Sequence, residues 1–477
     1  MATWYLFPKT PDNPVYDITL DHIRRLRDEN RQDTELGKQM TQSTYRGENF
    51  LLEDHGSRDG LYEEILHRDP LTAGMKIEYP HGVIIQQSQR RYLFRGENKQ
   101  YSRSVSSLLR ILDDPDKGYR SRKERELYRL VADMRVGEFI QLLKCFDHVK
   151  QWKDSSIIWE ALAQHYGLET GWLDITSNFD IALFFATCTY EAGKWRPLTK
   201  ADTEKNEQSK YGMIFYMPTR VMTSRLSRCL ERFSPITSDG TLVTNDNIQS
   251  HLFNEQMNLI FPIGFQPFMR CSMQDGYGLY MRTSSPLQED ADVQKLRFRH
   301  DEALSEHVFE EMEGGKAIYP HEGLTHVQYV IDKIRSLTTF SEEAFAYALE
   351  RSHYYRKADE EQCRQNLSRF SLCKDGQTVP IEITERSPWR ITPGKRRMIN
   401  SLYRDFSIQQ IYEIRVMERK ADKGPGFFEP WMLLEYEDSP GAIDFKPRPS
   451  AGCMSIEITN MIDRLAAIER GFPTDYM

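Results

Sequence analysis

The chain has 477 residues, of which 39% are hydrophobic and 28% are charged. This composition fits a globular protein with two or three hydrophobic cores and argues against a disordered chain. The formal net charge is -8, so the chain as a whole has no general attraction for nucleic acid or for an anionic membrane. The seven cysteines never form a C-x-x-C pair, which predicts neither a disulfide framework nor a zinc site, and we expect no bound metal.

The N-terminal text "MATWYLFPKTPDNP" lacks the basic start, the apolar run and the small-residue cleavage site of a signal peptide. No window approaches the roughly twenty apolar residues that cross a bilayer. We therefore expect a cytoplasmic protein without a membrane partner.

Three regions follow one another along the chain. Residues 1–80 are polar and charged, and helical spacing at 21–31 and 61–67 predicts a small appended N-terminal region. Residues 81–340 alternate strand-like and helix-like segments and predict the main domain. Residues 341–477 contain "TVPIEITE", "QIYEIRVMER", "WMLLEYED" and a helical pattern near the end, which predict a separate C-terminal α+β unit.

The periodicity of the main domain predicts an α+β fold, with a mixed sheet core and flanking helices. The strand "YLF" precedes Arg95, and "WLDIT" and "YGMIFYMP" are further strands. Helices are expected at 104–112, 122–152, 157–165, 179–188, 324–335 and 342–352. The polar residues 194–210 are predicted to form a loop.

The string Arg-Gly-Glu-Asn occurs twice, beginning at Arg46 and at Arg95. Arg46 follows polar text without a strand pattern, so we expect a surface loop that contributes nothing to ligand binding. Arg95 follows three apolar residues and lies at the end of a strand, where a rigid element aims a side chain into a cleft. Gly96 would let a ligand or another backbone approach closely. The second copy is therefore the candidate site.

An ordered set of motifs resembles the bacterial FRG domain, named for its Phe-Arg-Gly sequence. The motifs are "YLFRGENKQY", "LAQHYGLETGWLDITSNFDIALFFA" and "RCSMQDGYGLYM", and the similarity extends weakly over residues 83–334. The family usually shows Phe-Arg-Gly-Gln and Gly-Leu-Pro-Thr-Arg-Leu-Leu-Asp-Trp-Thr. This chain has Glu97, Glu169, Gly171 and Ile175 at the departing positions, and the missing basic residue at 171 weakens any phosphate contact there.

The FRG domain is in turn similar to the ADP-ribosyltransferases, whose elements occur in the same order. "LFRG" corresponds to their NAD-gripping Arg-Gly, and "DITS" before an apolar helix corresponds to their Ser-Thr-Ser motif. "RCSMQDGYG" stands where their catalytic glutamate strand would lie. The resemblance implies an ADP-ribosyltransferase-like fold with NAD as substrate and a macromolecular acceptor that the sequence does not identify.

The resemblance gives several residues a role in NAD chemistry. Arg95 would grip the diphosphate, because a planar guanidinium binds its oxygens bidentately. Asp174 would stabilise the oxocarbenium character that develops as the nicotinamide bond breaks. Gln274 stands where relatives have glutamate and offers hydrogen bonds but no charge. Each of these residues also has a purely structural alternative to its role in NAD chemistry. These alternatives are an ion pair between Arg95 and Glu97, a helix cap at Asp174 and an ordinary turn at Gln274.

Residues near "AQHYG" and "DITS" complete the expected site. His165 either faces the ligand or satisfies the last carbonyls of its helix, and Tyr166 either stacks on a ring of NAD or belongs to the core. Thr176 and Ser177 follow Asp174 at the end of its strand and are expected to contact the cofactor. These residues complete the candidate site as the sequence defines it.

Two functions from different classes fit these observations. The first is an NAD-dependent ADP-ribosyltransferase-like or NAD-cleaving enzyme, as in a bacterial toxin or an anti-phage defence component. The second is a non-catalytic nucleotide or ADP-ribose binding module that regulates a partner or its own C-terminal unit. The glutamine at 274 favours the second function, whereas Arg95, His165 and Asp174 favour the first. A scaffold that only binds a partner protein is a third, weaker alternative.

Overall fold

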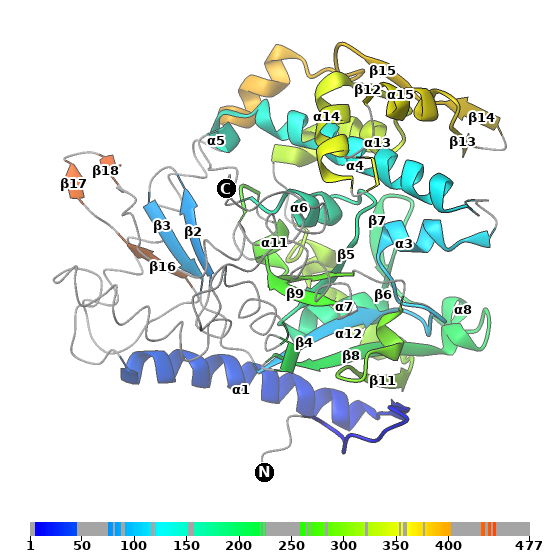
Figure 1. Ribbon diagram of the computed structural model, residues 1–477. Helices are drawn as coiled ribbons and strands as arrows, with labels where there is room; N and C mark the ends of the chain where they lie inside the picture. The colour runs from blue at the N-terminus through cyan, green and yellow to red at the C-terminus, as the bar shows by residue number, and fades with distance from the viewer. Residues whose placement is uncertain are drawn as a thin grey trace, which may run out of the picture.

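A computed structural model describes residues 5–44, 75–79, 82–86 and most of 91–401, and three short strands at 431–434, 437–439 and 442–444 (Figure 1). Within 91–401 the description leaves out residues 116–118, 120, 151–156, 220, 223–224, 226–257, 264–265, 269, 282–284, 320–322, 353, 356–359 and 375–376. The copy of Arg-Gly-Glu-Asn at Arg46 lies outside the described residues, as do the expected helices at 61–67 and near the C-terminus.

A seven-stranded mixed sheet forms the centre of the molecule, in the order β1-β11-β8-β4-β5-β10-β9. Its strands are β1 (Val15–Asp17), β11 (Gln294–Arg299), β8 (Tyr211–Pro218), β4 (Tyr92–Glu97), β5 (Trp172–Thr176), β10 (Gly276–Tyr280) and β9 (Leu259–Pro262). Only β1 pairs in parallel, with β11, and the other pairs are antiparallel. The two strands expected to carry site residues, β4 and β5, are therefore neighbours at the centre.

The two faces of this sheet pack against different elements. Strand side chains alternate between faces, and Phe94 packs with α7 (Phe179–Thr187), α12 (Glu302–Glu311) and α1 (Leu20–Thr44). We call this side the α7 face. Leu93, Leu173 and Ile175 lie on the other side with residues of α3 (Ser107–Leu112), which we call the α3 face.

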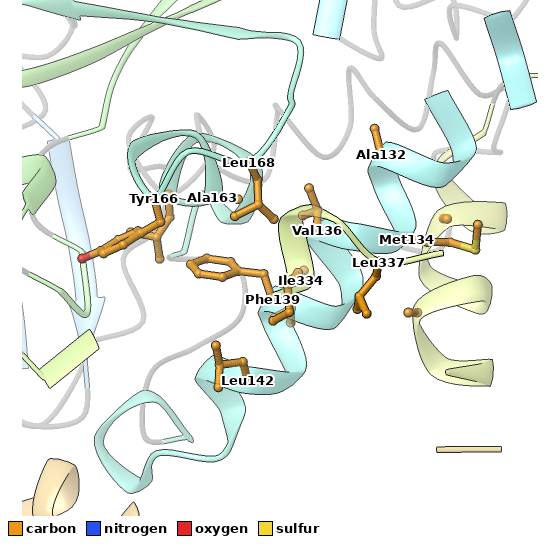
Figure 2. Close-up of a cluster of buried hydrophobic side chains, with 14 of the residues drawn as sticks. Ala132, Met134, Val136, Phe139, Leu142, Ala163, Tyr166, Leu168, Ile334 and Leu337 are labelled. Atoms are coloured by element: carbon orange, nitrogen blue, oxygen red, sulfur yellow. The ribbon is translucent and has the colours of Figure 1, made fainter. Parts of the chain in front are cut away.

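A helical layer beside the sheet holds the largest apolar cluster (Figure 2). It is built on α4 (Arg122–Lys144), α6 (Trp159–His165), α13 (Gln328–Arg335) and α14 (Glu342–Arg351). Val136, Phe139 and Leu142 of α4 share this cluster with Ala163, Tyr166 and Leu168 around the end of α6, and with Ile334 and Leu337 around the end of α13; Met134 lies on another side of α4 (Figure 2). Burial of these side chains fixes α6, and with it the residues that follow, against α4.

Segments from both expected flanking regions pack onto the main domain. Strand β1 extends the sheet, and Asn30 of α1 bonds the backbone at both Ser177 and Phe179. On the C-terminal side, buried Glu138 of α4 accepts hydrogen bonds from the Ser341 amide and the Trp389 indole. Strand β16 (Trp431–Leu434) pairs with β3 (Gly82–Gln86), which in turn pairs with β2 (Met75–Tyr79). The expected boundaries near residues 80 and 340 stay predictions, and these contacts cross them.

The α+β class expected from the sequence, with a mixed sheet and flanking helices, is confirmed. Strands β5 and β8 begin and end where the sequence pattern places them. The polar stretch 194–210 differs from the expected loop, because it forms strand β7 (Lys194–Pro197), helix α8 (Lys200–Thr203) and a short 3-10 turn. A hairpin with β6 (Cys188–Glu191) stabilises the first of these. Within the described part of the chain, no helix has the length and apolar character needed to cross a membrane.

Gly96 shows why the second Arg-Gly-Glu-Asn copy needs its glycine. A Cβ atom at this position would lie 1.7 Å from the carbonyl oxygen of Ala182 in α7, so only a glycine lets β4 and α7 pack at this distance. The backbone that approaches Gly96 is thus a helix of the same domain. Gly394 offers a matched contrast, because no atom lies within 4 Å of a Cβ placed there.

We expect Gly96→Ala to destabilise the protein by at least about 3 kcal/mol, because the helix or the strand must shift to admit the methyl group. Gly394→Ala is the control and should change the free energy of unfolding by less than about 1 kcal/mol. Urea unfolding of both variants measures the difference. Equal stability of the two variants would show that α7 is free to move away from β4.

Candidate functional site

The junction between β4 and β5 is the feature on which the candidate site is built. The two strands pair only through Phe94 and Thr176. Beyond that pair the backbone ladder stops, and the carbonyl oxygen of Asp174 accepts a hydrogen bond of 2.9 Å from Nη1 of Arg95 instead. A guanidinium thus replaces the backbone donor that a continued ladder would supply.

Arg95 and Asp174 come together in space, as expected from the sequence, but their side chains do not face one cleft. Arg95 alternates with Phe94 and belongs to the α3 face, whereas Asp174 lies between Leu173 and Ile175 and belongs to the α7 face. The expectation that both side chains line one cleft is therefore wrong. Its cause is the antiparallel register, which brings the two strands together but sends these two side chains to opposite sides of the sheet.

Arg95 already has a charged partner on the α3 face. Its Nε donates to Oε1 of Glu97 at 2.9 Å, and the Glu97 side chain is only 5% exposed. The hydroxyl of Ser104 donates to the second oxygen of this carboxylate at 2.6 Å. The ion pair that the sequence left as an alternative is thus present, and it neutralises the charge expected to grip a diphosphate.

Three expected residues meet on the α7 face. Nδ1 of His165 lies 3.0 Å from Oε1 of Gln274, and Nε2 of Gln274 donates to the carbonyl of Ile318 at 3.1 Å. Because Oε1 can only accept, Nδ1 of the histidine must donate, which leaves Nε2 as the acceptor in the neutral ring. This Nε2 is buried, has no hydrogen-bond partner among the described residues, and lies 3.8 Å from Oδ1 of Asp174.

Burial separates the roles of these three residues. The His165 side chain is 1% exposed, whereas that of Asp174 is 39% exposed. Burial lowers the pKa of His165 below its usual range, opposed by the negative charge of Asp174 and aided by the positive charge of Arg270. The imidazole is therefore neutral at pH 7, and the Asp174 carboxylate is the group that a ligand can reach.

Thr176 and Ser177 are held by the backbone around them. The Thr176 hydroxyl donates to the carbonyl of Gln274 at 2.8 Å and accepts from the amide of Asn178. The Ser177 amide donates to the carbonyl of Asp275, and the Ser177 carbonyl accepts from Asn30. These contacts fix the loop after β5 next to Asp174, and both side chains are buried. A cofactor-contacting role for Thr176 and Ser177 stays a prediction.

Arg270 and Tyr319 belong to this site although the sequence analysis assigned them no role. The Arg270 guanidinium lies over the ring of Tyr166 at 4.2 Å and over the ring of Tyr319 at 5.0 Å, and its Nη1 donates to the carbonyl of His165 at 2.7 Å. The signal was available, because Arg270 precedes Gln274 by four residues, the spacing of one helical turn. Burial raises the pKa of Tyr319, so its hydroxyl stays protonated at neutral pH.

Tyr166 is buried in the helical layer with only 2% of its surface exposed. Its ring packs against that of Phe139 (Figure 2). The ring of Phe268 and the guanidinium of Arg270 also pack against it. The core alternative from the sequence thus describes this residue, whose link to the site runs through Arg270.

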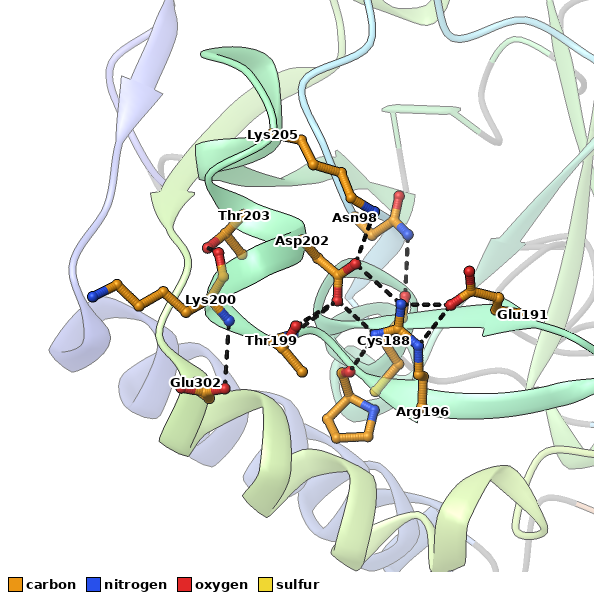
Figure 3. Close-up of polar contacts among 11 residues, drawn as sticks. Asn98, Cys188, Glu191, Arg196, Thr199, Lys200, Asp202, Thr203, Lys205 and Glu302 are labelled. Carbon is orange, nitrogen blue, oxygen red and sulfur yellow. Dashed lines mark hydrogen bonds and ion pairs between the residues drawn. The ribbon is translucent and has the colours of Figure 1, made fainter.

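A hairpin and a short helix close one side of the second Arg-Gly-Glu-Asn segment (Figure 3). Asn98 donates to the carbonyl of Cys188 at the start of β6. In the same hairpin Arg196 binds both Glu191 and Asp202, and this arginine holds the pKa of the Asp202 carboxyl well below its usual range. Ion pairs therefore stabilise the part of the polar stretch 194–210 that includes Arg196 and Asp202. Within the described ranges, no group of three or more His, Cys, Asp or Glu side chains is placed to hold a metal ion.

The Phe-Arg-Gly and His-Tyr-Gly motifs thus lie on and beside the mixed sheet of an α+β domain. The family model of the FRG domain matches residues 90–194, which include β4, α6, β5 and α7. Residues 90–194 are therefore similar to the FRG domain, and the match is shorter than the resemblance over 83–334 suggested. It includes Arg95, His165 and Asp174 but not Arg270 or Gln274. No curated protein and no solved structure gave a significant match.

The ion pair between Arg95 and Glu97 gives a stability prediction. Arg95→Met should destabilise the protein by about 3–5 kcal/mol, because it leaves the Glu97 carboxylate buried with only a hydroxyl donor. Adding Glu97→Gln should recover part of this loss, since the buried charge disappears. Urea unfolding of the single and double variants checks this. A double variant no more stable than Arg95→Met would show that the buried charge is not the source of the loss.

Proposed function

We propose that the FRG domain binds an NAD-type nucleotide on the α7 face and cleaves its nicotinamide–ribose bond at Asp174. The observation that carries this proposal is a partly exposed carboxylate beside a buried, neutral histidine whose Nε2 has no donor among the described residues. The resemblance to the ADP-ribosyltransferases supports NAD as the substrate, with water or a macromolecular group as the acceptor.

The chemistry of the bond explains why a carboxylate is needed. When the bond between the ribose C1′ and the nicotinamide nitrogen breaks, its electron pair leaves with nicotinamide and the sugar gains positive charge. Asp174 stabilises this charge because it is negative, fixed on a central strand and exposed on one side. The oxygen of water or of the acceptor then bonds to C1′ and passes its proton to the Asp174 carboxylate.

His165 has a supporting role in this scheme. Its Nε2 is a buried acceptor 3.8 Å from Oδ1 of Asp174, so it acts on the carboxylate, and the ribose hydroxyls would donate to Asp174. Gln274 fixes the ring by accepting from Nδ1, so the acceptor lone pair of Nε2 is kept next to Asp174. Gln274 thus acts on the histidine in the structure.

A binding module without catalysis is the second candidate. It is favoured by the amide of Gln274, which is engaged by His165 and Ile318 and brings no second negative charge to the site. In that case Asp174 would only accept hydrogen bonds from ribose hydroxyls, and NAD or ADP-ribose would bind without being consumed.

The two candidates make different predictions for Asp174→Asn. If Asp174 stabilises charge that appears only as the bond breaks, the variant should bind NAD nearly as well as the original protein and release nicotinamide at least about a hundredfold more slowly. Calorimetric titration measures binding, and chromatography of released nicotinamide measures cleavage. Asp17→Asn, the same change on the sheet-edge strand β1, is the control and should leave both unchanged.

A protein that binds NAD and never releases nicotinamide, with or without cell extract as a source of acceptor, would establish the binding module. Absence of NAD binding would contradict both candidates. A thermal melt of each variant separates a loss of chemistry from a loss of fold.

A further inference from the structure

Arg270 carries a positive charge that no carboxylate in the described part of the chain neutralises. Its contacts are the two tyrosine rings and the carbonyl of His165. Among the described residues, Nε is buried without an acceptor, and Nη2 makes no hydrogen bond and is not buried. This contrasts with Arg95, whose charge is taken up by Glu97. The uncompensated guanidinium points to a ligand that supplies the missing negative charge.

The contacts with the rings of Tyr166 and Tyr319 prepare this guanidinium to bind an anion. Aromatic faces stabilise the cation and hold its plane while leaving its edge free. The hydrogen bond to His165 fixes the remaining rotation. Less conformational entropy is lost on binding when the donor is already held in place. Phosphate oxygens suit such an edge, because two of them accept from parallel N–H groups.

Arg270 also belongs to the same site as Asp174. Both charges act on His165 and on Tyr319 in opposite directions, with Arg270 lowering and Asp174 raising the pKa of each. The Arg270 backbone begins the helical turn that ends at Gln274, since the Gln274 amide donates to the Arg270 carbonyl. An anion at Arg270 would therefore lie beside the carboxylate at which a sugar is bound.

We infer that Arg270 is the phosphate-binding group of this site and holds the diphosphate of the nucleotide. This inference rests on the proposed function for the identity of the nucleotide. It differs from the role expected of Arg95, which lies on the other face of the sheet.

Inorganic pyrophosphate is the probe that tests Arg270 without any sugar or base. Calorimetric titration at about 0.15 M ionic strength should show binding by the full chain, weakened about tenfold or more by Arg270→Gln. The pyrophosphate affinity of Arg270→Lys should lie between those of the original protein and Arg270→Gln, since lysine keeps the charge but lacks the planar set of N–H donors. Asp174→Asn should bind pyrophosphate more tightly, because a neighbouring negative charge has been removed.

Arg297→Gln is the matched control. Arg297 also lies over a tyrosine ring, that of Tyr211 at 4.5 Å, but it is paired with Asp17. Its replacement should leave pyrophosphate binding unchanged, because its charge is already compensated.

Pyrophosphate binding that survives in Arg270→Gln, or that is absent from the original protein, would overturn the inference. If Arg270→Gln fails to fold, as a melt would show, then Arg270→Lys and Asp174→Asn decide the question through their opposite effects. If pyrophosphate binding depends on Arg270 but the protein does not bind NAD, the phosphate site is retained and the proposed function is contradicted. If the protein cleaves NAD at the same rate with and without Arg270, the proposed function is retained and the phosphate site is contradicted.

Discussion

The early end of the ladder between β4 and β5 is the constraint from which the site follows. With only Phe94 and Thr176 paired, the next carbonyl of β5 must find another donor, and Arg95 provides it. The Phe-Arg-Gly motif is thus explained by structure at each position. Phe94 fills the α7 face, Arg95 closes the strand junction, and Gly96 admits α7 against β4. The motif that the sequence assigned to ligand binding thus supports the strand that carries Asp174, and its role in ligand binding stays a prediction.

The chemistry that remains lies on the α7 face and depends on what burial does to a histidine. A solvated imidazole near a carboxylate would gain a proton readily, but burial works against the charged form of His165. Gln274 then decides which nitrogen keeps the single proton. A glutamate at this position would favour a doubly protonated ring, so the glutamine fits a site in which the histidine accepts a hydrogen bond.

The sequence predicted the α+β class and the two central strands, because strand and helix periodicities are strong in these segments. That His165, Asp174 and Gln274 belong to one site was implied by the resemblance to the FRG domain and the ADP-ribosyltransferases, and the three side chains do lie together. The sequence did not predict on which face each side chain lies. That depends on the register between strands almost eighty residues apart, and a shift of one residue reverses the outcome. Arg270 escaped notice for a related reason. Its importance comes from its two tyrosine neighbours and from the lack of a carboxylate partner in the described part of the chain, and both are properties of the folded chain.

The separation of the two arginines has a consequence for electrostatics. Arg95 and Glu97 form a buried pair, so the α3 face near the junction presents little net charge to a ligand. On the α7 face, Arg270 and Asp174 are both present without forming an ion pair with each other among the described residues. Opposite charges kept apart in a partly buried site attract a ligand that is itself polarised, with an anion at one end and a centre that becomes positive at the other. A diphosphate linked to a ribose has this pattern of charge, whereas a uniformly acidic or basic ligand would be repelled by one of the two groups.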